Sequence, residues 1–315
     1  MAENPNDWKP ATKLIRGGLM RSEHGETAEA LYLTQSFVYD SAAGADARFA
    51  GDAPGFIYSR YANPTTAMFE QRLALPAGVS ARANPKSSTG RVDVFVRLLT
   101  ETGGTFDDVP EGYAGKVFLE IAPQTFSVLA RTGTRLNQLR LRRSGTVATR
   151  TTSVGVDLTL DIAGFRARRH AGVIDLDKVG GHDPRDFWEP LHPRHGELVL
   201  DPGEFYILAS KESIEIPVLE AAEMTPIDPS VGEFRVHYAG FFDPGFGTAE
   251  CNGEGSKGVL EVRSHETPFL LEDGQTVARL VYEPLTERPT RLYGDSGSHY
   301  QAQGLKLSKH FSAWR

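Results

Sequence analysis

The sequence predicts a mainly β protein, a sandwich or jelly roll, containing two copies of one β-rich module of which the first is truncated. From residue 73 onward, short runs that alternate apolar and polar residues recur between Gly- and Pro-containing turns, and convincing helical patterns are few. Val117–Glu120 is similar to Gly258–Glu261, and Leu73–Pro76 is similar to Ile214–Pro217. Both pairs have the same separation along the chain, which indicates an internal duplication.

These patterns divide the chain into three segments: residues 1–72, a first and incomplete module over 73–143, and a second module over 144–315. A helix is expected at the end of the first segment, with Asn63 as its cap and Pro64 in its first turn. It continues into the first module without a Gly, Ser or Pro linker. Such a junction suggests a fusion of two reading frames, which would leave the first module without its opening strands.

Individual elements follow from local patterns. Residues 84–91 of the first module read as a polar loop, and Val92–Leu99 as a strand or short helix. In the second module, Val154–Leu160 alternates as a strand does. Gly258–Leu285 contains two β-rich runs around an Asp-Gly turn, which predicts a hairpin.

Composition excludes several classes of protein. The chain of 315 residues has 40% hydrophobic residues and a mean hydropathy of −0.33, as globular domains do. Its net charge of −7 argues against a nucleic-acid polymer as partner. No apolar run approaches the roughly 18 residues of a membrane span, so no membrane partner is expected. The single cysteine, Cys251, precludes an intramolecular disulfide and fits a reducing cytoplasm.

The first segment contains TKLIRGG, LTQSFVYDSA and the run at 58–65, YSRYANPT. These stretches resemble the start of pyridoxal-phosphate enzymes of methionine biosynthesis, closest to O-succinylhomoserine sulfhydrylase. In that family the Tyr and Arg of the YSR motif, here Tyr58 and Arg60, bind cofactor phosphate across a subunit interface. The resemblance ends near Leu73, before the family's Schiff-base lysine. We therefore expect a truncated remnant that binds no pyridoxal phosphate.

Two other groups of polar residues are candidates for chemistry. Lys86–Arg91 combines two charges, three hydroxyls and a glycine, but it lacks the Walker pattern. By itself it fits either an oxyanion-orienting loop or a solvated turn. His182, His192 and His195 have no acidic or cysteine ligand at a supporting spacing, so we expect surface histidines and no metal.

Four motifs in a fixed order give a second resemblance. They are Ser-Ser-x-x-Arg at 87–91, Asp-Pro-Gly-Phe at 243–246, Val-Leu-Glu at 259–261 and Tyr-x-x-Gln-Gly at 300–304. Together they resemble deoxycytidine triphosphate deaminases of the two-module bacterial type, over roughly residues 73–315. This family has the trimeric dUTPase-like β fold. The resemblance implies a homo-oligomer that takes a deoxynucleoside triphosphate and hydrolyses dCTP to dUTP and ammonia.

The resemblance also implies roles for single residues. Glu261 matches the general base that activates water for attack at cytosine C4. Ser87 and Arg91 match the residues that hold this water and the base edge, and Asp243 matches the aspartate at the nucleoside. His299 stands where single-module relatives often have Lys. The further substrate-binding residues expected are Lys86, Ser88, Val259, Leu260, Tyr293, His299, Tyr300 and Gln303.

The chemistry is expected to be metal-free. Hydrolytic deamination needs a base for water and an acid for ammonia, and one carboxylate can serve as both. Zinc deaminases carry an H-x-E…P-C-x-x-C signature, which a chain with one cysteine cannot supply. We therefore expect no zinc, and Mg²⁺ only on the substrate triphosphate.

Several alternatives remain open at this point. The first module has the Ser/Arg motif but Pro110 in place of Asp243, whereas the second has Glu223–Ser230 in place of that motif. This predicts one composite site from both modules. The alternative site lies in the first module, with Glu120 as the base beside Ser87 and Arg91. The alternative functions are a dUTP diphosphatase, a bifunctional enzyme, or an inactive gene-fusion product.

Overall fold

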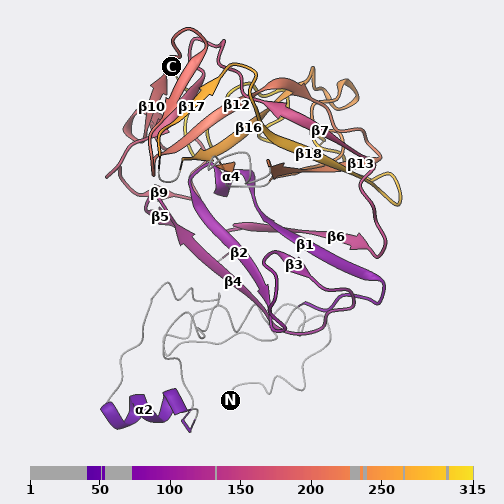
Figure 1. Ribbon diagram of the computed structural model, residues 1–315. Coiled ribbons are helices and arrows are strands. Elements are labelled where there is room, and N and C mark those ends of the chain that lie inside the picture. The colour runs from indigo at the N-terminus through magenta and orange to yellow at the C-terminus, as the bar shows by residue number, and fades with distance from the viewer. Residues whose placement is uncertain are drawn as a thin grey trace. The chain divides into compact units, whose positions relative to one another are not determined.

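The computed structural model describes residues 41–50, 52–53, 73–131, 133–227, 235–236, 240–264, 267–295 and 298–314. The described part of the chain is mainly β, which confirms the predicted fold class (Figure 1). The helix expected from Pro64, and the residues Tyr58 and Arg60, lie outside the described residues.

The described elements have the following order and bounds: α2 (Ala42–Ala50), β1 (Val79–Pro85), α4 (Ser87–Gly90), β2 (Val94–Thr100), β3 (Asp108–Val109), β4 (Val117–Pro123), β5 (Val128–Leu129), β6 (Asn137–Arg143), β7 (Arg150–Gly155), β8 (Gly164–Ala167), β9 (Ile174–Asp175), η2 (Pro184–Asp186), β10 (Trp188–Leu191), β11 (Glu197–Leu200), β12 (Phe205–Ile214), β13 (Glu220–Pro226), β14 (Arg235–Val236), β15 (Phe241–Phe242), η4 (Ala249–Cys251), β16 (Ser256–Arg263), β17 (Phe269–Glu272) and β18 (Thr276–Pro284).

The chain forms two compact units. Unit 1 comprises residues 1–81, 98–120 and 131–133, and unit 2 comprises residues 82–97, 121–130 and 134–315. Part of the predicted first module, including the Ser-Ser-x-x-Arg motif, therefore belongs to the same unit as the whole predicted second module.

Unit 1 is held together around Tyr113. An isolated bridge joins Ala74 to Ala114, and the amide of Leu75 donates to the carbonyl of Tyr113 at 2.8 Å. The Tyr113 hydroxyl accepts from the amide of Glu101 at 3.1 Å. These bonds satisfy backbone groups that a short, irregular segment would otherwise leave unpaired.

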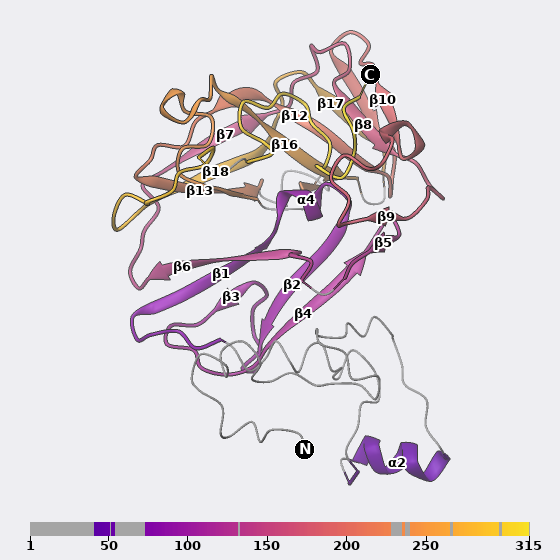
Figure 2. The same ribbon diagram turned by 180° about the vertical axis from the view of Figure 1, so that it is seen from behind.

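Unit 2 contains a sandwich of two sheets. One sheet has the order β10-β8-β12-β16-β14, and the other has the order β15-β13-β18-β7 (Figures 1 and 2). Strands β12 and β16 supply Leu208 and Leu260 to the core, and β13 and β18 supply Met224 and Leu280. All four side chains are at most 2% exposed, so the two sheets share one hydrophobic core.

The expected hairpin over Gly258–Leu285 is wrong in its pairing. The turn exists, with Gly274 at a positive φ of 78°, but its two strands belong to different sheets. β17 pairs with β11, and β18 pairs with β13 and β7. An Asp-Gly turn fixes the local reversal of the chain, whereas the burial of each strand's apolar face selects its partner.

Two further elements differ from expectation. The strand predicted over Val154–Leu160 ends at Gly155, because the Asp157 carboxylate accepts from the amide and the hydroxyl of Thr159, at 3.1 and 2.6 Å, and turns the chain. The polar loop predicted over 84–91 contains the end of β1 and the one-turn helix α4. The following segment is a strand, β2, as one of the two readings predicted.

Candidate active site

A cavity of about 230 Å³ opens in unit 2 beside α4 and β16. It is lined by Pro85, Lys86, Ser87, Ser88, Gly90, Arg91, Gln138, Met224, Gly240, Phe241, Phe242, Asp243, Phe246, Val259, Glu261, Tyr293, Ser298, His299, Tyr300, Gln303 and Lys309. The structure thus brings together residues of both predicted modules in one cavity of one chain.

Strand β16 places Glu261 at this cavity. Side chains alternate between the two faces of a strand, so Val259 and Glu261 line the cavity while Leu260 points the other way. Leu260 is 0% exposed and belongs to the hydrophobic core. The expectation that Leu260 lines the substrate site is therefore corrected for its side chain.

The helix α4 places the serines and the arginine. Lys86 is extended, with φ −67° and ψ 146°, and the chain then turns so that the amide of Gly90 donates to the Lys86 carbonyl at 3.0 Å. The amide of Arg91 donates to the Ser87 carbonyl, also at 3.0 Å. This single turn presents Ser87, Ser88 and Arg91 to the cavity.

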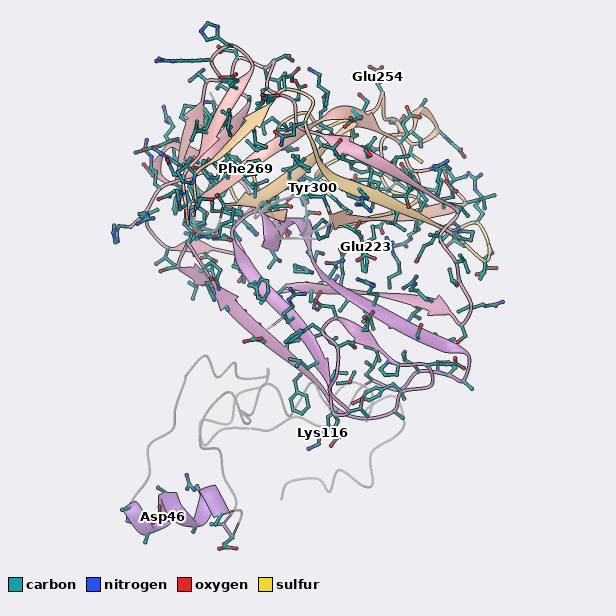
Figure 3. All side chains as sticks on the ribbon, in the orientation of Figure 1. Asp46, Lys116, Glu223, Glu254, Phe269 and Tyr300 are labelled. Carbon is teal, nitrogen blue, oxygen red and sulfur yellow. The ribbon has the colours of Figure 1, made fainter. Side chains whose placement is uncertain are left out.

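The Arg91 guanidinium lies among groups that fix its position. Its Nη1 donates to Gln303 Oε1 at 3.1 Å and to the Lys306 carbonyl at 3.0 Å. Its carbon Cζ lies 4.0 Å from the centre of the Tyr300 ring. Figure 3 shows Tyr300 near α4. Its Nε lies 3.7 Å from Glu261 Oε1, too far for a direct hydrogen bond, and bonds to no described residue.

Burial changes the acidity of Glu261. Removal from water raises the pKa of this carboxyl to about 7, and the nearby positive charge of Arg91 opposes part of that rise. A carboxyl with a pKa near 7 exists in both protonation states at neutral pH, so it can accept a proton and later donate it. Glu261 therefore has the property required of an acid/base catalyst.

A group of basic side chains lies at the cavity. Lys86, His299 and Lys309 line it, and Lys306 lies close by, with its Nζ donating to the His299 carbonyl at 2.6 Å. Burial lowers the pKa of Lys86, and then the charge of Lys309 lowers it further. Burial and the neighbouring lysines also lower the pKa of His299. Mutual repulsion of this kind is relieved by a bound polyanion such as a phosphate chain.

The C-terminal segment 298–312 is fixed to the rest of unit 2 at several points. Gln301 accepts from the Gly247 amide at 3.0 Å and donates to the Gly245 carbonyl at 3.1 Å. Ser308 Oγ donates to the Ser88 carbonyl at 2.9 Å. Residue Phe311 forms a parallel bridge with His182. These bonds hold Tyr300 and Gln303 against Arg91.

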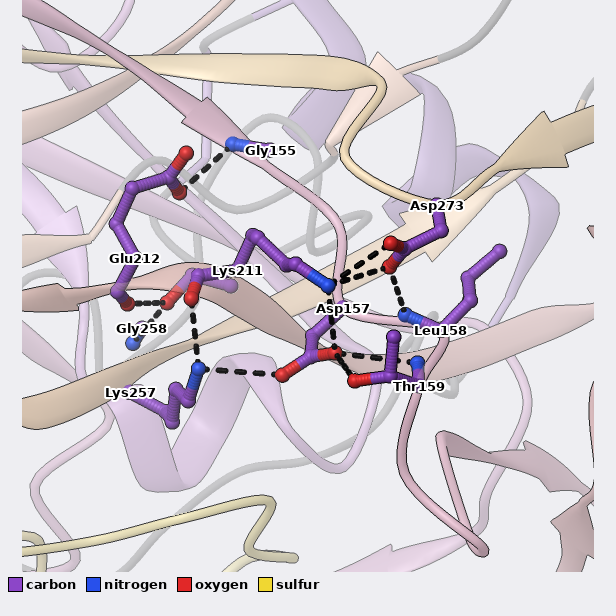
Figure 4. A network of polar contacts seen from close by, with 10 residues as sticks. Gly155, Asp157, Leu158, Thr159, Lys211, Glu212, Lys257, Gly258 and Asp273 are labelled. Atoms are coloured by element: carbon purple, nitrogen blue, oxygen red, sulfur yellow. Dashed lines mark hydrogen bonds and ion pairs between the residues drawn. The ribbon is translucent and has the colours of Figure 1, made fainter. Parts of the chain in front are cut away.

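A polar network supports the first residues of β16 (Figure 4). The carboxylate of Asp157 lies 3.2 Å from Lys257 Nζ and 3.6 Å from Lys211 Nζ, and Asp273 accepts from Lys211 Nζ at 2.8 Å. The backbone of Lys257 pairs with Gln303 in both directions, each bond being 2.8 Å long. The network therefore helps to position the glutamine that holds Arg91.

Asp243 lies at the cavity edge, with a side chain that is 53% exposed. Its Oδ1 is 3.3 Å from Arg140 Nη2, which also donates to the Phe242 carbonyl at 3.2 Å. The Arg140 guanidinium lies 4.1 Å from the centre of the Phe241 ring. Residues of β6 and β15 thereby orient the Asp-Pro-Gly-Phe turn.

The predicted site residues and the cavity agree except at two positions. One is Leu260, described above, and the other is Glu120, which is exposed on β4 in unit 1 and does not line the cavity. Sequence reasoning did not select several lining residues, among them Gln138, Met224, Phe241, Phe246 and Lys309. Phe246 ends the Asp-Pro-Gly-Phe motif and Lys309 belongs to the basic tail, so both could have been found.

The histidines considered for a metal site have other contacts. His182 Nε2 accepts from the Asp175 amide at 3.0 Å, and His192 Nδ1 lies 2.8 Å from the Asp161 carbonyl. Among the described residues, no group of three or more His, Cys, Asp or Glu side chains could hold a metal ion.

In the part of the chain that the structure describes, no helix is long and apolar enough to cross a membrane.

Comparison with known families shows to which family the chain belongs. The model of the C-terminal domain of 2'-deoxycytidine 5'-triphosphate deaminase matches residues 127–311, and that of its N-terminal domain matches residues 65–145. The chain belongs to the 2'-deoxycytidine 5'-triphosphate deaminase family. The predicted resemblance over the β modules is thereby confirmed, and the Ser87 to Gln303 motifs lie within the matched ranges.

A solved member of this family has a similar structure. The 2'-deoxycytidine 5'-triphosphate deaminase of Agrobacterium tumefaciens is 51% identical, with a TM-score of 0.64. The similarity covers 69% of this chain and 72% of that chain. The fold and a large part of the sequence of this deaminase are therefore shared.

The other resemblance is also found, over a shorter part of the relatives. O-succinylhomoserine sulfhydrylase of Mycobacterium tuberculosis is 46% identical over 94 residues, which is 30% of this chain and 23% of that protein. The enzyme of the same name from Pseudomonas aeruginosa is 41% identical over 92 residues, or 29% of this chain and 23% of that protein. The chain thus spans less than a quarter of the length of these curated relatives.

Proposed function

We propose that this chain hydrolyses dCTP to dUTP and ammonia, with Glu261 as the acid/base group. The observation that supports this most strongly is the buried Glu261 carboxyl, with a pKa of about 7, in the cavity beside Arg91. Family membership supplies the substrate class, and the cavity supplies a group able to move the protons of the reaction.

The proposed reaction begins with water at C4 of the cytosine ring. The Glu261 carboxylate accepts a proton from this water as its oxygen bonds to C4, the C4=N3 electron pair moves to N3, and the carboxyl passes the proton to N3, so that C4 becomes tetrahedral. The carboxylate then accepts the proton of the new C4 hydroxyl and donates it to the amino nitrogen, the C4–N bond breaks, and ammonia leaves as the C4 carbonyl forms. One carboxyl thus accepts and returns both protons of the water in each turnover. Arg91, at 3.7 Å, favours the carboxylate form that begins the cycle.

The basic, aromatic and acidic side chains of the cavity suit different parts of the substrate. Lys86, His299 and Lys309 suit the triphosphate, with Mg²⁺ accompanying it as part of the substrate. Phe246 and Tyr293 form an edge-to-face pair with ring centres 5.3 Å apart, which suits an apolar surface of the nucleoside. The exposed carboxylate of Asp243 can accept a hydrogen bond from the sugar.

The proposed site is composite. Ser87 and Arg91 come from the predicted first module, and Asp243, Glu261 and the C-terminal segment come from the second, yet all line one cavity of unit 2. Glu261 belongs to the same unit as Ser87 and Arg91, which supports this arrangement. Replacement of Glu261, and then of Glu120, tests which of the two carboxyls is the base.

We also propose that the protein acts as a cytoplasmic homo-oligomer on a free nucleotide. The single Cys251 and the net charge of −7 support a reducing compartment and a partner other than a nucleic-acid polymer. Light scattering of the purified protein tests the oligomer, and a mass equal to one chain at micromolar concentration would contradict it.

The decisive experiment is an incubation of the purified full-length protein with dCTP and Mg²⁺. We expect equal amounts of ammonia and dUTP, and neither product from the matched Glu261→Gln variant. Release of pyrophosphate with dUMP would instead identify the diphosphatase or bifunctional alternative. Absence of all products from folded wild-type protein would identify an inactive fusion.

A further inference from the structure

A second ion pair, Asp93–Arg263, lies two residues further along both segments that carry the proposed catalytic pair, Arg91–Glu261. The acidic and basic residues are exchanged between the two segments. Asp93 stands two residues after Arg91, and Arg263 stands two residues after Glu261. The Arg263 Nη2 is paired with the Asp93 carboxylate. Because residues two apart on a strand share a face, Arg263 and Glu261 project from the same side of β16. Neither Asp93 nor Arg263 lines the cavity.

The Asp93 carboxylate joins segments that are distant in sequence. Its side chain is 2% exposed, and its Oδ2 also accepts from Thr125 Oγ1 at 2.6 Å. Thr125 Oγ1 in turn accepts from Arg263 Nη2 at 2.9 Å, and Arg263 Nη1 donates to the Gly203 carbonyl. The three side chains form a polar cluster between β16, the end of the α4 turn and the segment after β4.

The backbone at Asp93 indicates that this cluster constrains the turn. Its φ of 55° is left-handed, a conformation that non-glycine residues adopt at an energetic cost. The amide of Asp93 donates to the Gly90 carbonyl at 2.9 Å, which closes the turn that follows α4. Arg91 lies within this turn, which directly follows the α4 turn that presents Ser87.

We propose that the Asp93–Arg263 pair is a positioning pair, which fixes the distance between Arg91 and Glu261 by attaching the α4 turn to β16. Gln303, Lys306 and Tyr300 orient the guanidinium of Arg91 from the C-terminal segment, whereas the Asp93–Arg263 pair attaches its backbone directly to the strand that carries Glu261. The inference rests on the proposed deaminase function.

The test uses Asp93→Asn, because Asn tolerates a left-handed φ and keeps an acceptor for Thr125 while the charge is lost. We expect kcat to fall about 10- to 100-fold, as small misplacements of catalytic groups do, with KM for dCTP within about 2-fold. The pH–rate limb that belongs to Glu261 should move to higher pH, because a displaced Arg91 lowers the carboxyl pKa less.

Companion variants separate positioning from general destabilisation. Arg263→Met should lower kcat and shift the pH profile as Asp93→Asn does. The kcat of the double variant should be no lower than that of either single variant, and Arg263→Lys should retain most of the activity. Glu189→Gln is the matched control, since it removes the 2.6 Å ion pair with Arg166 in the same unit and should leave kcat and the pH profile unchanged. The other titratable groups at the cavity, Lys86, Arg91, Asp243, Tyr293, His299, Tyr300 and Lys309, are unchanged in all these proteins.

Wild-type kcat and an unshifted pH profile in Asp93→Asn and Arg263→Met would overturn the proposal, as would losses that only follow the unfolded fraction. If the wild-type protein does not convert dCTP, the proposed function is wrong, and the positioning role of the Asp93–Arg263 pair is tested without turnover. The pair is then tested by ¹³C NMR titration of Glu261, assigned by its absence from Glu261→Gln. An upward shift of that pKa in Asp93→Asn supports positioning, and an unchanged pKa refutes it.

Discussion

Replacing Glu261 by Gln keeps the size and shape of the side chain but removes its ionisation. In the folded protein the carboxyl pKa is raised from 4.5 to about 7, mainly by burial. The folded state therefore binds this proton more tightly than the unfolded chain does. Its contribution to stability is fully present below about pH 4.5, and it is lost as pH rises through 7.

The magnitude follows from the size of this shift. A change from 4.5 to about 7, at about 1.4 kcal/mol per pKa unit, corresponds to about 3 kcal/mol of unfolding free energy. The Gln variant has no such loss. Between pH 4 and pH 8, the unfolding free energy of the Gln variant should therefore rise by about 3 kcal/mol relative to that of the wild type. Any cost of the altered contact with Arg91 is the same at every pH and cancels in this comparison.

Urea denaturation of both proteins across this pH range measures the effect, with dCTP turnover and calorimetric binding measured on the same samples. Turnover should fall by at least ~10²-fold in the variant, while dCTP binding is retained, because a positioned acid/base group is lost but the phosphate site is not. Parallel curves of unfolding free energy against pH would refute the raised pKa. Near-normal turnover would place the base elsewhere, with Glu120 the next residue to replace.

Three further predictions concern the same protein. Arg91→Ala should reduce kcat about as much as Glu261→Gln, and the double variant should be no worse than either, because groups that act together are not additive; multiplicative losses in steady-state kinetics would assign them to different sites. Deamination should resist a zinc-specific chelator yet fall when Mg²⁺ is withdrawn from the triphosphate; activity that is lost to the chelator and restored by Zn²⁺ would contradict a metal-free mechanism. The purified protein should show no absorbance band of bound pyridoxal phosphate, since the chain spans only 23% of the sulfhydrylases it matches, and such a band would contradict a truncated remnant.

Local sequence determined the strand character of most of unit 2, the Asp-Gly turn at 273–274 and the order of the motifs that identify the family. These features depend on few neighbouring residues. Alternation along β16 also separates Glu261 from Leu260, so the core-facing direction of Leu260 was available from the pattern alone. The resemblance, and not this alternation, placed Leu260 at the substrate, and a contact of its backbone with substrate stays a prediction.

Tertiary structure decided which strands pair and which motifs meet. β17 and β18 flank one turn yet join different sheets, because each buries its apolar face against strands distant in sequence. Arg91 and Gln303 are 212 positions apart and bond directly, and Gln138 and Met224 reach the cavity without any motif. The raised pKa of Glu261 likewise depends on burial by residues from many segments. The sequence by itself named the acid that the reaction needs, and only the packing around it sets its proton affinity.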